Sequence, residues 1–186
     1  FRLHDNYYGI NGSGETYIYM AIRAPMMVEP ESGTEVFAQD TSNSTGDNKE
    51  PAYRAPFPVD MAINSETSGN HHEISSRLTQ GKLMYTNLTN AEVSSSWMKY
   101  DYSRGWFYTT NTTSQESFKH SHMFKRAKGF FDVVAYTGNG PSNHDVNHSL
   151  GVVPEMIIVK PRDAINHWIC YHSELGATKY LHLSLT

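Results

Sequence analysis

The sequence predicts an all-β protein built from antiparallel β-sandwich modules with long loops and little helix. Along residues 129–185, apolar bursts of about five residues alternate with turns rich in Gly, Pro and Asn, which is typical of short antiparallel strands. Residues 16–22 alternate with large side chains on both faces, as expected for a strand covered on both sides. No segment sustains the 3.6-residue period of an amphipathic helix.

The C-terminal segment, residues 129–186, is interpreted as the start of a second sandwich module. Its expected strands share short apolar runs bounded by turn residues, and they are residues 131–136, 145–148, 155–159, 168–172 and 179–185. The run at 155–159 is apolar throughout, which favours a place in the centre of a sheet. The last strand alternates between leucines on one face and Tyr180, His182 and Ser184 on the other.

Three further segments precede it. Residues 1–40 are interpreted as the C-terminal part of a first β-sandwich module. Residues 41–56 are rich in Ser, Thr, Asn, Asp and Pro and predict a linker or long loop. Residues 57–128 form a middle β-rich segment. Its expected strands are residues 57–63, a pair around the turn at 80–81, a hairpin of 97–102 with 105–108, and residues 121–125.

The composition is that of a folded protein with a polar surface. The chain has 186 residues, of which 38% are hydrophobic and 18% charged. The formal net charge is -4 and no Lys/Arg cluster occurs, which excludes a basic nucleic-acid-binding surface. No apolar run approaches the ~20 residues of a membrane span, so no membrane insertion is expected. Because the chain begins without Met and ends inside a strand pattern, we expect a piece of a longer polypeptide.

Several phrases carry a resemblance to a known family. The C-terminal segment contains YTGNG, then HSLGVVPEMIIVK, then W-x-x-YHSELGATKYL. Upstream, YIYMAIRAP precedes GTEVFA, and MFKRAKGFFDVVAYTGNG stands where one module would end and the next begin. These phrases resemble a module repeated in tail fibre and tail-tip proteins of tailed bacteriophages, especially marine ones. Residues 41–117 match that module more loosely.

The resemblance implies jelly-roll or lectin-like sandwiches in a virion structural and adhesion protein, located in the phage tail and extracellular. The partners it implies are copies of the chain in a homotrimer, other tail proteins, and a glycan or protein receptor on the host cell surface. It defines no catalytic residue, so neither enzyme activity nor a cofactor is expected. The alternatives are a carbohydrate-binding lectin-like module and, with less support, a fragment of a polysaccharide depolymerase.

His120 and His122 form an H-x-H pair and are the candidate metal ligands. On a strand, both imidazoles project from one face, about 7 Å apart. Around a threefold axis such pairs can bind a transition metal, because neutral imidazole is a good ligand. The alternative is two exposed polar residues preceding a buried Phe124, which is the commoner situation for histidine.

Tyr100, Tyr102, Trp106 and Tyr108 are the candidate glycan-binding residues. An aromatic ring stacks on the apolar face of a sugar while nearby Asn and Asp side chains bond its hydroxyls. The equally supported alternative is that these rings fill the core of a sandwich. For Trp97, the core interpretation is favoured.

No constellation of residues predicts catalysis. The spacing of the acidic residues selects no pair for glycoside hydrolysis. Cys170 and His172 share one strand face about 7 Å apart, too far for a nucleophile pair. Cys170 is therefore expected to be a small core residue. His148 precedes a tight turn, where a structural role in fixing the loop is favoured over catalysis.

Overall fold

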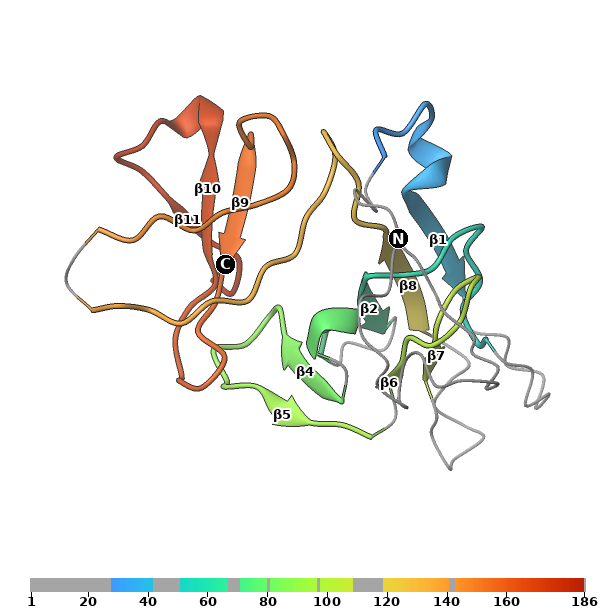
Figure 1. The fold of residues 1–186 in the computed structure, drawn as a ribbon. Coiled ribbons are helices and arrows are strands. Elements are labelled where there is room, and N and C mark those ends of the chain that lie inside the picture. Colours follow the sequence, from blue (N-terminus) through green and yellow to red (C-terminus); the bar gives the residue numbers. More distant parts are fainter. Residues whose placement is uncertain are drawn as a thin grey trace, which may run out of the picture.

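The computed structural model describes residues 28–41, 51–66, 71–79, 81–96, 98–108, 119–140 and 143–185 (Figure 1). Over these residues the chain is built from short antiparallel strands, and its helical elements are single 3-10 turns. This confirms the all-β prediction. No helix in this part of the chain is long and apolar enough to cross a membrane.

The elements are short, and the longest strands have six residues. The strands are β1 (Phe37–Thr41), β2 (Met61–Glu66), β3 (Glu73–Ser76), β4 (Lys82–Tyr85), β5 (Val93–Ser94), β6 (Met98–Lys99), β7 (Phe107–Tyr108), β8 (Lys119–Phe124), β9 (Met156–Val159), β10 (Ile169–His172) and β11 (Leu181–His182). The 3-10 turns are η1 (Gly33–Glu35), η2 (Arg77–Thr79) and η4 (Ser173–Leu175).

The largest sheet has six strands in the order β1-β8-β2-β3-β4-β5. The second strand of this sheet, β8, pairs antiparallel with β1 on one side and with β2 on the other. In one register row, Ala38 faces Met123 and Met123 faces Ala62. Met123 and Ala62 are buried, so this row lies on the inner face of the sheet. Strand β1, which lies across the end of the predicted first module, therefore shares a sheet with the middle segment.

A second layer covers the inner face and is formed by the β6–β7 hairpin and residues 53–59. Trp106 is its central side chain. The Tyr53 ring stacks on one side of Trp106 at a centroid distance of 5.1 Å and an angle of 16°. The Tyr100 ring stacks on Trp106 at 5.3 Å and 10°. Burying three such rings removes several hundred Å² of apolar surface from water, so this stack contributes substantially to the stability of the core.

The polar tips of these rings are bonded to the six-stranded sheet. The Trp106 indole Nε1–H donates to the Ser121 Oγ at 2.9 Å. The Tyr100 hydroxyl lies 2.6 Å from the Ser75 Oγ. A buried donor without an acceptor would cost about 1–3 kcal/mol, so these two bonds fix where the rings can sit against the sheet.

The end of the predicted linker belongs to this core. Tyr53 is 1% exposed, and its backbone exchanges two hydrogen bonds with Trp106, at 3.1 and 3.0 Å. Thr41 is the last residue of β1, so the predicted linker or long loop begins one residue later than expected. Residues 42–50 lie outside the described part of the chain.

The C-terminal segment forms a separate three-stranded sheet in the order β11-β10-β9, seen beside the larger sheet in Figure 1. It is joined to the β4–β5 region by Arg162, whose Nε lies 2.6 Å from a Glu92 carboxylate oxygen. The Trp168 indole donates to the Tyr85 carbonyl at 2.8 Å, and Trp168 is buried. The C-terminal and middle segments therefore pack against each other.

Two predicted strands in the C-terminal segment are wrong. Residues 131–136 and 145–148 do not form strands. The Asp132 carboxylate accepts the backbone N–H groups of Val133 and Ser149, at 2.9 and 2.7 Å. The Asp132 side chain thus accepts hydrogen bonds from backbone N–H groups that could otherwise pair with a neighbouring strand.

The strand predicted at residues 155–159 is present as β9, but it lies at an edge of its sheet as far as the chain is described. All four of its residues are exposed, from 38% for Val159 to 54% for Met156. Its continuous apolar run was expected to lie in a sheet centre, and that expectation is wrong for the described residues.

Replacing Gly105 with Ala is expected to destabilise the fold. Gly105 has a φ of 103°, and a Cβ there would lie 1.9 Å from the Tyr53 carbonyl oxygen. Because backbone on both sides of this contact belongs to the core, we expect a loss of more than about 2 kcal/mol of unfolding free energy by urea denaturation. Gly138→Ala is the matched control, since nothing lies within 4 Å of its added Cβ. Equal stability of the two variants would contradict the close packing of Tyr53 under Gly105.

Candidate functional site

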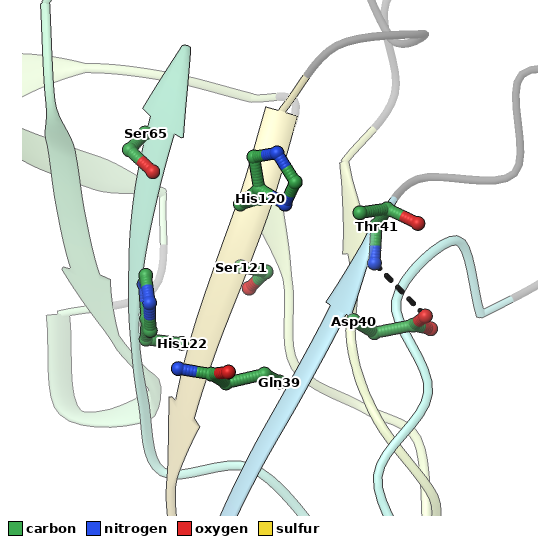
Figure 2. A pocket seen from close by; sticks show the side chains of 7 residues that line it. All are labelled: Gln39, Asp40, Thr41, Ser65, His120, Ser121 and His122. Carbon is green, nitrogen blue, oxygen red and sulfur yellow. Dashed lines mark hydrogen bonds between the residues drawn. The ribbon is translucent and has the colours of Figure 1, made fainter. Parts of the chain in front are cut away.

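An open pocket of about 510 Å³ lies over the end of the six-stranded sheet where β1, β8 and β2 run side by side (Figure 2). Its lining is polar and comes from these three strands. The lining residues are Gln39, Asp40, Thr41, Ser65, His120, Ser121 and His122. We call this region the β8 groove.

The two imidazoles of the groove come from β8. Because side chains alternate along a strand, His120 and His122 project from the outer face while Ser121 is buried beneath them. The prediction that the two histidines share one face is confirmed. His120 is exposed and His122 is half-buried.

The neighbouring strands place hydrogen-bonding groups beside the imidazoles. Gln39 of β1 pairs with His122, and Ser65 of β2 pairs with His120. The Phe37 ring, one position along on the same face, is stacked against His122 at 6.4 Å and 21°. The groove therefore combines an amide, a hydroxyl and two imidazoles with an adjoining aromatic ring, a combination suited to a ligand rich in hydroxyl groups.

Asp40 contributes no carboxylate to the imidazole side of the groove. Its oxygens accept the N–H groups of Thr41 at 2.9 Å and Arg54 at 2.7 Å. In Figure 2 its carboxylate points away from the two histidines. Among the described residues, no group of three His, Cys, Asp or Glu side chains could hold a metal ion. Metal binding by His120 and His122 stays a prediction that would need ligands from elsewhere.

Three of the four candidate glycan-binding rings are in the core. Tyr100 and Trp106 are 0% exposed and Tyr108 is 4% exposed, so the expectation that they present a ring to a sugar is wrong. The reason is the register of the hairpin, which turns these side chains toward Ser121 and Ser75. Burial also raises the pKa of the Tyr100 hydroxyl, which therefore stays protonated.

Tyr102 is the remaining member of that set. It is half-buried, and its ring contacts Phe107 at 6.2 Å. It is separated along the sequence and across the two layers from the β8 groove. Trp97, which was expected in the core, lies outside the described residues.

The surroundings of Cys170 and His148 indicate structural roles for both residues. Cys170 is 6% exposed, as expected of a core residue, and burial raises the pKa of its thiol. The His148 Nδ1 accepts the N–H of Leu150 at 3.3 Å, so His148 fixes the turn that follows it.

Asp132 is a buried ionic centre that sequence reasoning did not single out. Its carboxylate is 3% exposed and lies 2.6 Å from the Arg126 Nε. Burial by itself would raise the pKa of this carboxyl, but the Ser149 N–H and the Arg126 guanidinium outweigh that effect, and the pKa is lowered. Asp132 thus ties the end of β8 to the loop that enters the C-terminal sheet.

Comparison with known proteins covers part of the chain. Residues 106–186 match the model of a family described as a domain of unknown function (DUF7483). No curated protein matches the chain, and no solved structure matches it. The matched part includes β7, β8 and the C-terminal sheet, but not the partners of β8 in the groove, β1 and β2.

We expect Asp132 to make folding sensitive to acid. Its folded-state pKa is lowered, so its stabilisation is present above the unfolded-state pKa of about 3.9 and is lost as the pH falls through the folded value. Asp132→Asn keeps only one acceptor oxygen and should cost about 1–3 kcal/mol at pH 7, with a smaller difference from the native chain at pH 3. Urea unfolding at both pH values measures this. A pH-independent difference, or one equal to that of the exposed-residue control Asp145→Asn, would contradict the role of the Asp132 carboxylate.

Proposed function

We propose that this chain is part of a virion structural and adhesion protein, in a phage tail fibre or tail tip that contacts the host cell surface. The observation that carries the proposal is the resemblance of the phrases HSLGVVPEMIIVK and YHSELGATKYL to the repeated tail-protein module. An all-β scaffold of antiparallel sheets supports it, since such sheets expose their connecting loops and outer faces to a surface receptor. The protein acts by binding and carries no catalytic role.

The β8 groove is the contact surface that we propose for the host. It is open, it lies on the outer face of the largest sheet, and its amide, hydroxyl and imidazole groups can bond the hydroxyls of a sugar. This supports the second candidate function, a carbohydrate-binding lectin-like module. The two functions are compatible, because a tail protein can adhere through glycan recognition.

Removing polar groups from the β8 groove is expected to weaken host binding. Gln39→Ala combined with His120→Ala deletes two exposed side chains of the groove without touching the buried stack. Losing two or three ligand hydrogen bonds of about 1 kcal/mol each should weaken binding by about 30-fold to 150-fold. Binding of the labelled chain is measured on a glycan array and on a panel of bacterial strains.

The control for that experiment is Thr178→Ala, an exposed substitution in the C-terminal segment. Unchanged thermal unfolding of all variants separates lost contact from lost fold. If the variant carrying Gln39→Ala and His120→Ala binds as tightly as the native chain, the contact surface does not include the β8 groove. If the native chain binds no strain and no glycan, the chain serves as scaffold and the adhesion proposal fails for it.

We also propose that copies of the chain associate, as a trimer, through the edge of the C-terminal sheet. The exposed apolar strand β9 supports this, because an uncovered apolar edge strand is a template for pairing with another chain. Ile158→Glu should convert the trimer to monomers at micromolar concentration, as measured by light scattering coupled to size exclusion. Val153→Glu is the control, since Val153 is exposed but lies outside the strand. A native chain that is monomeric at that concentration counts against the trimer.

A further inference from the structure

Two imidazoles meet on one face of the C-terminal sheet, between β10 and β11. His182 of β11 is paired with Ile169 of β10. Continuing the same register places His167 opposite Ser184, two positions further along the pair of strands, so the two histidines are diagonal neighbours. Their ring centroids are 4.6 Å apart with an interplanar angle of 66°. No other two imidazoles are in ring contact within the part of the chain that the structure describes.

The surroundings of His167 orient its ring. Its Nδ1 lies 3.1 Å from the Ser184 Oγ. When the Nδ1–H donates to that hydroxyl, the lone pair remains on Nε2, which is the tautomer that a metal ion requires. A hydrogen bond of this kind on the second ring nitrogen is the usual support of a ligating histidine.

The ring of His182 has the complementary property. Its Nδ1 is buried and has no hydrogen-bond partner. A buried polar atom without a partner calls for an explanation, and a bound ion or water is the ordinary one. The Tyr180 ring packs edge-on against His182 at 5.3 Å and 85°.

The separation of the two rings is compatible with one metal ion shared between them. A ligating nitrogen lies about 2.1 Å from its metal, which puts the ring centroid about 3.2 Å away. Two rings on one ion therefore have centroids about 4.5 Å apart for a right angle at the metal and about 5.2 Å apart for a tetrahedral angle. The observed 4.6 Å fits the right angle. Right angles between nitrogen ligands are the geometry of tetragonal Cu(II) and Ni(II) sites.

We propose that His167 and His182 form a binding site for one divalent copper or nickel ion, held by the two imidazoles with water in the remaining positions. The described residues supply no third His, Cys, Asp or Glu ligand. Water ligands suit a site of this kind, because both histidines are partly exposed. The site lies at the opposite edge of the sheet from β9, and it is distinct from the β8 groove.

The experiment uses the full chain carrying His120→Ala and His122→Ala, which removes the two histidines of the β8 groove. CuCl₂, NiCl₂ and ZnCl₂ are each titrated into this background by calorimetry in a buffer that does not bind metals. We expect one Cu(II) per chain, a tetragonal electron paramagnetic resonance spectrum with splitting from two nitrogens, and affinity in the order Cu(II) over Ni(II) and Zn(II).

Three variants in the same background test the assignment. His182→Ala and, independently, His167→Asn should each abolish stoichiometric binding, whereas Ser184→Ala should weaken it roughly tenfold by freeing the His167 ring. Thr178→Ala should leave it unchanged. Circular dichroism confirms that each variant folds. Because two ligand variants are used, the test still decides the question if one of them fails to fold.

Three results would overturn the proposal. The first is no stoichiometric Cu(II) binding, in which case water is the hydrogen-bond partner of the buried His182 Nδ1. The second is binding that survives both ligand variants, which would place the ion on other histidines. The third is a spectrum that shows a single nitrogen ligand.

Discussion

The position of the Trp106 ring is the constraint on which the rest of the larger unit depends. Tyr53 and Tyr100 both stack on the ring nearly parallel to it, and its indole N–H is bonded to Ser121 of β8. The Trp106 ring cannot shift along its stacked partners without breaking the buried hydrogen bond of its indole N–H. Leaving that donor without an acceptor would cost about 1–3 kcal/mol, so the stack is held in one position. The hairpin, the segment around Tyr53 and the six-stranded sheet are thereby held in one arrangement.

The same constraint positions the β8 groove. Ser121 must face inward to accept the hydrogen bond from the Trp106 indole N–H. Strand alternation then requires His120 and His122 to face outward. A slip of one residue in β8 would bury both imidazoles and expose Ser121. The outer polar surface that we assign to ligand contact is thus set by a core hydrogen bond on the other side of the sheet.

Local patterns predicted the fold class and several elements. The β6–β7 hairpin and the strands β9 and β10 were found because alternation and turn residues are encoded within each segment. The pairing of β1 with β8 could not be predicted, because it joins residues about 80 positions apart in the sequence and no local pattern records it. The absent strand at residues 131–136 has a local apolar pattern, but the Asp132 carboxylate competes for the backbone donors nearby.

The candidate site shows the same limit. The pattern H-x-H identified His120 and His122, whereas Gln39 and Ser65 carry no signal of their own and enter the groove only through strand pairing. The sequence does not show whether Tyr100, Trp106 and Tyr108 are exposed or buried, because aromatic residues are common at binding surfaces and in cores. Their burial follows from polar partners on a distant strand, Ser121 among them. The pair of His167 and His182 likewise depends on the register of β10 with β11.

The most direct test of this account is native-state hydrogen exchange at the Trp106 indole N–H, followed by NMR. Because this proton is buried in the stack and bonded to Ser121, it should exchange only through global unfolding, at the same free energy as the slowest backbone amides of β8. Exchange within minutes under native conditions, or at a free energy well below that of β8, would show that the stack does not hold the two layers together.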